Sequence, residues 1–177
     1  MQFTRPVPIS PEMKPSFKTF VSHSEAMNQW LRQWALHNEE EGYSRTYATF
    51  CLTTGKLAGY YTLSNFAIMT RDLPASLQKK APPAIPCMLL GRLAVDANYE
   101  GQGLGRALVI NAIRQTLKVS ETSGIWGLVV HPLTPSLIRF YSNLNFQLSP
   151  NPEQLLMYYA LRCNCKVEIP WSRFASN

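Results

Sequence analysis

The residues best suited to chemistry form a glycine-rich run, NYEGQGLGRAL, at positions 98–108. Three of its members are Gly101, Gly103 and Gly105, and the run directly precedes a segment with the apolar spacing of a helix. The first N–H groups of a helix have no partner within it, and the helix dipole makes that end positive. Glycine lets the backbone approach a phosphate closely. The run therefore predicts a backbone site for a phosphate-bearing ligand.

Two common nucleotide-binding motifs do not fit this run. A P-loop needs a lysine after its last glycine, and none follows here. The dinucleotide fingerprint needs a third glycine where Arg106 stands, and an acid after the next strand, where the chain has Val130 and His131. Arg106 adds a charged donor, although a cation in the first turn opposes the helix dipole. A glycine-rich turn without a ligand is the structural alternative.

The glycine run lies at the centre of a mixed order of elements. Alternating or apolar stretches predict strands over 44–53, 55–70, 88–96 and 125–131, and a further strand within 155–171. Spacing of apolar residues predicts helices over 22–42, 105–119 and 134–146. The first two strands form a predicted hairpin, residues 1–16 are expected to be extended, and 71–86 is a basic, proline-rich loop that can contain one helical turn. This order favours an α/β (α+β) fold in a single domain of residues 1–177.

Composition limits the classes of protein to which this chain can belong. The 177 residues are 46% hydrophobic and 16% charged, as in a globular chain, and the net charge of +6 favours an acidic partner such as nucleic acid, a polyanionic cofactor or an acidic protein. No apolar run is long enough for a membrane span, and we expect no secretory signal. We expect no metal site and no disulfide framework, in a reduced, cytoplasmic protein. The cysteines, which are scattered and far from the histidines, are Cys51, Cys87, Cys163 and Cys165.

The segment LGRLAVDANYEGQGLGRALV resembles motif A of the GNAT family of N-acetyltransferases. The signature [Q/R]-x-x-G-x-[G/A] maps to Glu100, Gly103 and Gly105, and Glu100 departs from the expected Gln or Arg. The order of strand, loop, helix, strand and a helix with a Phe-Tyr pair also resembles the family core. The resemblance implies a central mixed, mostly antiparallel sheet flanked by helices. It also implies that the loop amides bind the pyrophosphate of acetyl-CoA.

Acetyl transfer to an amine needs a neutral amine, a donor for the developing oxyanion and a proton for the departing thiolate. The resemblance implies that the Val95 N–H is the oxyanion donor and that Tyr141 is the proton donor. A phenol with a pKa of about 10 stays protonated at pH 7; a core tyrosine is the alternative. In FYSNLNF, Asn145 replaces the glycine that the family often has, and Asn also tolerates a positive φ. The cofactor-binding candidates are Leu93, Ala94, Val95, Gly101, Gln102, Gly103, Leu104, Gly105, Arg106 and Phe140.

No carboxylate stands out as a general base. Asp96 and Glu100 are the nearest acids, and both are expected to be solvated loop residues. A lysine amine, with a pKa of about 10.4, would need help to lose its proton, whereas an α-amine, near 7.7–8.0, is already partly neutral. We infer that the acceptor is an α-amine.

The resemblance extends over about 16–160, because SRTYATFCLTTGKLAGYYTLS, IPCMLLGRLAVD and FYSNLNF are similar to the acetyltransferase toxins of bacterial type II toxin–antitoxin pairs. It implies acetylation of aminoacyl-tRNA, a block of translation, a small ribbon-helix-helix antitoxin, operator DNA reached only through that antitoxin, and a homodimer. The tail WSRFASN is an antitoxin contact or a frayed end. The candidate tRNA phosphate contacts, each of which could instead be a solvated surface charge, are Arg45, Arg71, Lys79, Lys80 and Arg92.

Two other functions remain open from the sequence. One is an acetyltransferase that acts on a protein N-terminus or a small amine. The other is a non-catalytic regulator that binds RNA or coenzyme A.

Overall fold

The computed structural model describes residues 2–162, so the tail WSRFASN and the last two cysteines lie outside the described residues. Two compact units interleave along the chain: within the described part, unit 1 comprises 2–64 and 92–112, and unit 2 comprises 65–91 and 113–162. Strands β3 (Leu57–Met69) and β4 (Ala84–Val95) and helix α5 (Leu104–Ser120) each have residues in both units. The predicted single domain stays a prediction.

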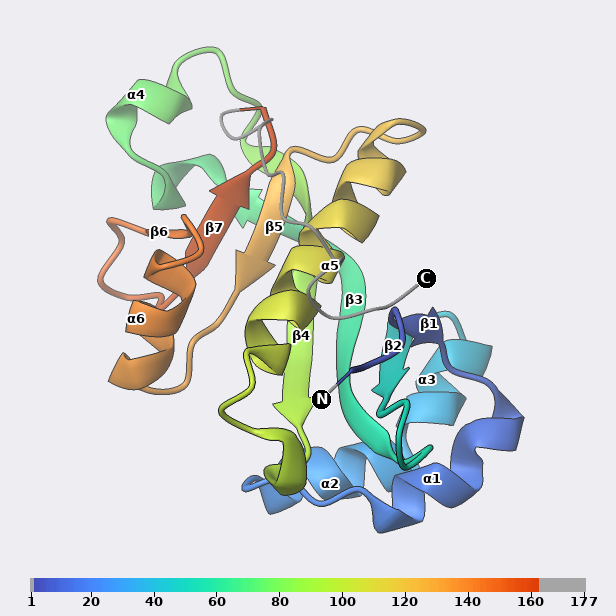
Figure 1. Cartoon of the computed structure of the whole chain (residues 1–177). Coiled ribbons are helices and arrows are strands. Elements are labelled where there is room, and N and C mark those ends of the chain that lie inside the picture. Colours follow the sequence, from blue (N-terminus) through green and yellow to red (C-terminus); the bar gives the residue numbers. More distant parts are fainter. Residues whose placement is uncertain (1, 163–177) are drawn as a thin grey trace. The chain divides into compact units, whose positions relative to one another are not determined.

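Seven strands form one sheet in the order β1-β2-β3-β4-β5-β7-β6 (Figure 1). Strands β4 and β5 (Gly127–Val130) pair in parallel, whereas β1–β2, β2–β3, β5–β7 and β6–β7 pair antiparallel. The expected mixed, mostly antiparallel sheet with flanking helices is therefore confirmed.

Unit 1 is built on the predicted hairpin of β2 (Arg45–Phe50) and β3, in which Tyr47 lies opposite Tyr61. The predicted helix over 22–42 is divided at Trp34, where φ is −117°, and Ser24 caps its first part by accepting the Met27 N–H. The other elements of this unit, apart from β4 and α5, are β1 (Val7–Pro8), η1 (Pro11–Met13), α1 (Lys14–Thr19), α2 (Glu25–Gln33), α3 (Ala35–Glu40) and η3 (Ala97–Tyr99).

The expectation that residues 1–16 are extended is wrong from Pro11 onward. Pro11 begins the 3-10 helix η1, and Pro15 lies in the first turn of α1. Proline is tolerated in the first turn because the N–H that it lacks would have no helical partner there. Pro11 and Pro15 therefore open helices, whereas Pro8 lies in the extended strand β1.

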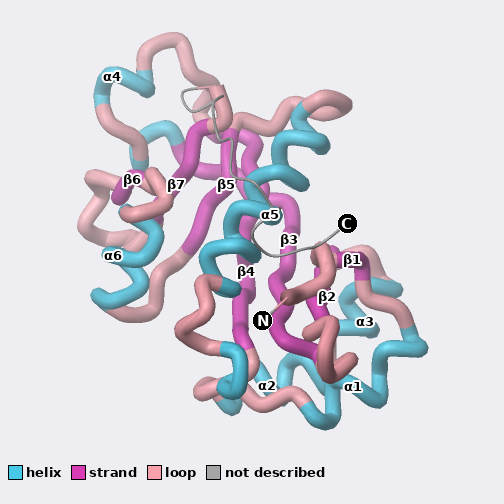
Figure 2. The backbone as a smooth tube through the Cα atoms, viewed as in Figure 1, coloured by secondary structure: helices cyan, strands magenta, loops and turns pink. Residues whose placement is uncertain are grey.

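Unit 2 contains β5, α6 (Pro135–Ser142), β6 (Gln147–Leu148) and β7 (Met157–Ala160). The strand expected within 155–171 is confirmed as β7, and the two-residue β6 was not predicted. Between β3 and β4 the chain forms η2 (Thr70–Asp72) and α4 (Ala75–Gln78), so this segment is mostly loop with a short helix, as expected (Figure 2). Among residues 2–162, no helix has the length and apolar character needed to cross a membrane.

Candidate functional site

The glycine-rich run forms a loop that ends in the N-terminus of α5. Gly101 and Gly103 have φ values of 71° and 78°, which L side chains rarely adopt. The Gly103 carbonyl accepts the Ala107 N–H at 3.1 Å, which closes the first turn of the helix. Within the described part of the chain, hydrogen bonds are lacking for the N–H groups of Gln102, Gly103, Leu104, Gly105 and Arg106. Five free donors at the positive end of a 17-residue helix suit a phosphate ligand.

A buried hydrogen bond fixes the first half of α5 in unit 1. The Tyr61 hydroxyl donates to Asn111 Oδ1 at 2.5 Å, and Tyr61 stacks on Tyr47 with ring centroids 5.1 Å apart. Burial raises the pKa of Tyr61 far above its usual range, so this phenol remains a donor. Asn111 is polar but only 7% exposed. Its position among apolar residues was the only sequence signal for this bond.

The direction of the Val95 N–H follows from the hydrogen bond of the next residue. The next residue, Asp96, donates its N–H to Ala58 O on β3 at 2.9 Å. Because successive N–H groups of a strand point to opposite edges, the Val95 N–H faces away from β3. The pairing of β4 with β5 ends at Leu89 and Val129. Within the described residues, therefore, no strand pairs with this edge at Val95.

The two acids near the loop have structural partners. Asp96 is only 4% exposed and accepts the N–H of Val21 at 2.9 Å and that of Asn98 at 3.0 Å, so it is not the solvated residue that was expected. Glu100 is exposed, and its carboxylate lies 3.1 Å from His23 Nε2. Glu100 departs from the family signature, but its carboxylate is paired with His23. It is therefore not an unpartnered carboxylate beside the loop amides.

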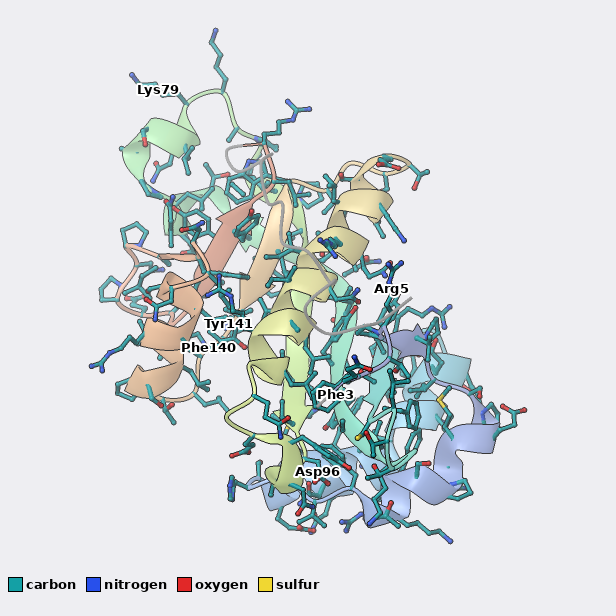
Figure 3. The ribbon with its side chains drawn as sticks, viewed as in Figure 1. Phe3, Arg5, Lys79, Asp96, Phe140 and Tyr141 are labelled. Atoms are coloured by element: carbon teal, nitrogen blue, oxygen red, sulfur yellow. The ribbon has the colours of Figure 1, made fainter. Side chains whose placement is uncertain are left out.

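Tyr141 lies on α6 in unit 2, beside Phe140 (Figure 3). Its ring packs on Phe140 and Phe146 at centroid distances of 5.1 Å and 5.4 Å, and the residue is 7% exposed. Burial raises its pKa to about 12, so the phenol keeps its proton at neutral pH. Its hydroxyl makes no hydrogen bond with any residue of the described part. Asn145 has a φ of 65°, and the predicted turn after the helix is confirmed.

The predicted basic residues divide into two groups. Arg45 lies 3.0 Å from Glu39, and the Arg92 guanidinium lies 4.9 Å from the centre of the Trp30 ring, so both have protein partners. No salt bridge of residues 2–162 involves the second group, whose exposed members are Arg71, Lys79 and Lys80.

The remaining candidates are placed within single units. Leu93, Gln102 and Leu104 lie in unit 1, with Leu104 fully buried at the start of α5, whereas the half-buried Phe140 lies in unit 2. In the described part of the chain, no group of three or more His, Cys, Asp or Glu residues is arranged to hold a metal ion.

The family model described as Acetyltransferase (GNAT) family matches residues 11–146. The chain belongs to the GNAT family. It is therefore an acetyltransferase of the kind that uses acetyl-CoA.

Similar proteins indicate which members of the GNAT family this chain resembles. A tRNA-acetylating toxin of Mycobacterium tuberculosis (strain ATCC 25618 / H37Rv) is 32% identical over 139 residues, which are 78% of this chain and 82% of the relative. The structure of AtaT complexed with acetyl-methionyl-tRNAfMet has a TM-score of 0.84 and 28% identity, covering 92% of this chain and 96% of that chain. The structure of AtaTR bound with AcCoA has a TM-score of 0.77 and 28% identity, covering 92% and 95%.

Proposed function

We propose that this enzyme is the toxin of a type II toxin–antitoxin pair, which transfers an acetyl group from acetyl-CoA to the α-amino group of aminoacyl-tRNA and so inhibits translation. The choice of aminoacyl-tRNA as the acceptor rests on the similarity to the tRNA-acetylating toxin. The net charge of +6 agrees with a polyanionic substrate.

The chain supplies three functions to the reaction. The free amides of residues 102–106 hold the pyrophosphate of acetyl-CoA, which brings an activated acetyl group. The Val95 N–H stabilises the negative charge that develops on the acetyl oxygen, and Tyr141 gives its proton to the departing thiolate. An α-amine is neutral in part at pH 7, so attack needs no dedicated base from the protein.

Partners follow from the same proposal. A small ribbon-helix-helix antitoxin would bind the toxin and bring it to operator DNA, and the toxin would form a homodimer in the cytoplasm. The resemblance of the hairpin, β4 and FYSNLNF segments to toxins of this class supports these partners.

The test is acetyl transfer from radiolabelled acetyl-CoA to a mixture of charged tRNAs and to peptides with free N-termini. We expect label on the aminoacyl group, and growth arrest when the chain is expressed alone. Label on the peptides but not on tRNA would replace the proposal with an N-terminal acetyltransferase. Binding of RNA or coenzyme A without any transfer of acetyl groups would contradict the proposal and favour a non-catalytic regulator.

The dependence of the rate on pH reports the raised pKa of Tyr141. We expect kcat/KM to rise as the α-amine loses its proton near pH 8 and then to stay level, because the phenol keeps its proton until about pH 12. The measurement is kcat/KM for aminoacyl-tRNA from pH 6 to pH 9.5, with the spontaneous loss of the aminoacyl group subtracted. A falling limb below pH 9 would contradict Tyr141 as the proton donor.

A further inference from the structure

Residues 70–83 form a closed lobe between β3 and β4, which we call the basic lobe. Its two ends meet at Thr70, whose N–H donates to Pro83 O at 3.0 Å and whose hydroxyl donates to Pro82 O. Within the lobe, the Gln78 side chain donates to Leu73 O at 2.6 Å. Figure 1 shows this segment as a loop that carries α4. The segment is thus a loop whose ends and interior are held by its own hydrogen bonds.

The surface of the basic lobe is cationic. It exposes Arg71, Lys79 and Lys80, and Lys79 is visible on it in Figure 3. Its one acid, Asp72, is 1% exposed and contributes little to the surface. The described part of unit 2 has seven Lys and Arg against three Asp and Glu, so the lobe belongs to the more basic unit.

A polar clamp of two hydrogen bonds holds the lobe to the segment between β6 and β7. Asp72 Oδ1 accepts from the Asn151 side-chain amide at 2.7 Å, and the Asp72 carbonyl accepts the Ser149 hydroxyl at 2.7 Å. Leu73 is fully buried in the same apolar cluster as Leu156. A surface that is fixed before binding loses less conformational entropy when it binds a partner.

Lys80 has an unusual backbone conformation, with a φ of 60°. This left-handed region suits glycine or asparagine, and a lysine there is strained. Local stability alone would favour one of those two residues. A strained residue in an exposed cationic segment indicates that the side chain has a role of its own.

We propose that the basic lobe is a preformed binding site for the phosphate backbone of tRNA, with Lys80 as a direct phosphate contact and with Asp72, Ser149 and Asn151 as positioning residues. This inference rests on the proposed tRNA substrate. None of the residues 70–83 is among those proposed to hold acetyl-CoA, so the lobe should affect the binding of tRNA and not that of acetyl-CoA.

The first test compares Lys80→Asn with Lys80→Arg and with Lys56→Asn, which removes an exposed lysine from the turn between β2 and β3. Lys80→Asn should weaken binding of uncharged tRNA and raise KM for aminoacyl-tRNA, each by about fivefold, and should lower the slope of log affinity against log salt by about 1. It should not lower stability, because asparagine relieves the strain. Lys80→Arg should retain binding, and Lys56→Asn should bind as the wild type does.

The second test addresses the clamp. Asn151→Ala should raise KM for aminoacyl-tRNA severalfold while kcat and KM for acetyl-CoA stay unchanged, because the lobe loses the amide that donates to Asp72. A general loss of folding would lower kcat for both substrates. A rise in KM for aminoacyl-tRNA alone therefore distinguishes a positioning role from a loss of folding.

Failure of the proposed function can be distinguished from failure of the lobe inference. Lobe-dependent binding of tRNA without acetyl transfer would overturn the proposed function and leave the lobe inference standing. Acetylation of aminoacyl-tRNA with the same tRNA affinity in wild type and Lys80→Asn would overturn the lobe inference, and the lobe would then serve a different partner, such as an acidic protein segment.

Discussion

Replacing Tyr141 by phenylalanine should lower kcat for acetyl transfer by about 10²- to 10⁴-fold, the usual contribution of a general acid. The substitution removes only the phenol, and the ring contacts with Phe140 and Phe146 remain. KM for acetyl-CoA should stay within about twofold, because the loop amides that hold the pyrophosphate are unchanged. The measurement is steady-state acetylation of aminoacyl-tRNA by the purified variant.

The control for this experiment is Tyr43→Phe, which removes a phenol from an exposed residue of unit 1. Its kcat should match the wild type. The Tyr141 hydroxyl has no hydrogen-bond partner within residues 2–162, so Tyr141→Phe should also change the free energy of unfolding by less than about 1 kcal/mol. A variant that is fully folded and fully active would show that another group protonates the thiolate.

Replacing Gly101 by valine should raise KM for acetyl-CoA by tenfold or more. Gly101 has a φ of 71°, which a β-branched residue adopts only with strain, so the loop would turn its next N–H groups away from the ligand. The loss of one hydrogen bond to a charged phosphate costs about 1.5–3 kcal/mol, and each 1.4 kcal/mol corresponds to a tenfold change in affinity. Calorimetric binding of acetyl-CoA and KM for acetyl-CoA both measure the effect.

The matched control is Gly55→Val in the turn between β2 and β3. Gly55 has a φ of 67°, and a side chain at either glycine would meet no atom of residues 2–162 within 4 Å of its Cβ. Both variants should lose about 1–2 kcal/mol of stability from the same backbone strain. Only Gly101→Val should lose affinity for acetyl-CoA. An equal loss of affinity in both would assign the effect to general destabilisation and contradict the role of the loop.

The elements around the site could be predicted because their signals are local. The helix after the glycine run was expected over 105–119 and spans Leu104–Ser120, and Thr134 caps α6 as the Thr-Pro pair indicated. The turn at Asn145 followed from its tolerance of a positive φ. In each case the deciding interaction joins residues within a few positions of one another, so the pattern of one short segment was sufficient.

The roles of single polar residues could not be predicted in the same way. Arg45 and Arg92 were equal candidates with Lys80 for phosphate contacts. The structure separates them because Arg45 has Glu39 and Arg92 has Trp30 as a partner. An isolated charge in a sequence gives no indication of whether its partner is solvent, an acid or an aromatic ring.

The sequence by itself determined the order of the elements, the glycine loop at the head of a helix and the Phe-Tyr pair on a later helix. These features depend on backbone propensity and on apolar spacing, which act over a few residues. Tertiary structure decided that Asp96 is buried, that Tyr61 holds Asn111, and that Asp72 anchors the basic lobe. Those hydrogen bonds join residues 75, 50 and 79 positions apart. Whether a polar group is solvated or buried with a partner depends on which distant segments pack together, and no local pattern contains that information.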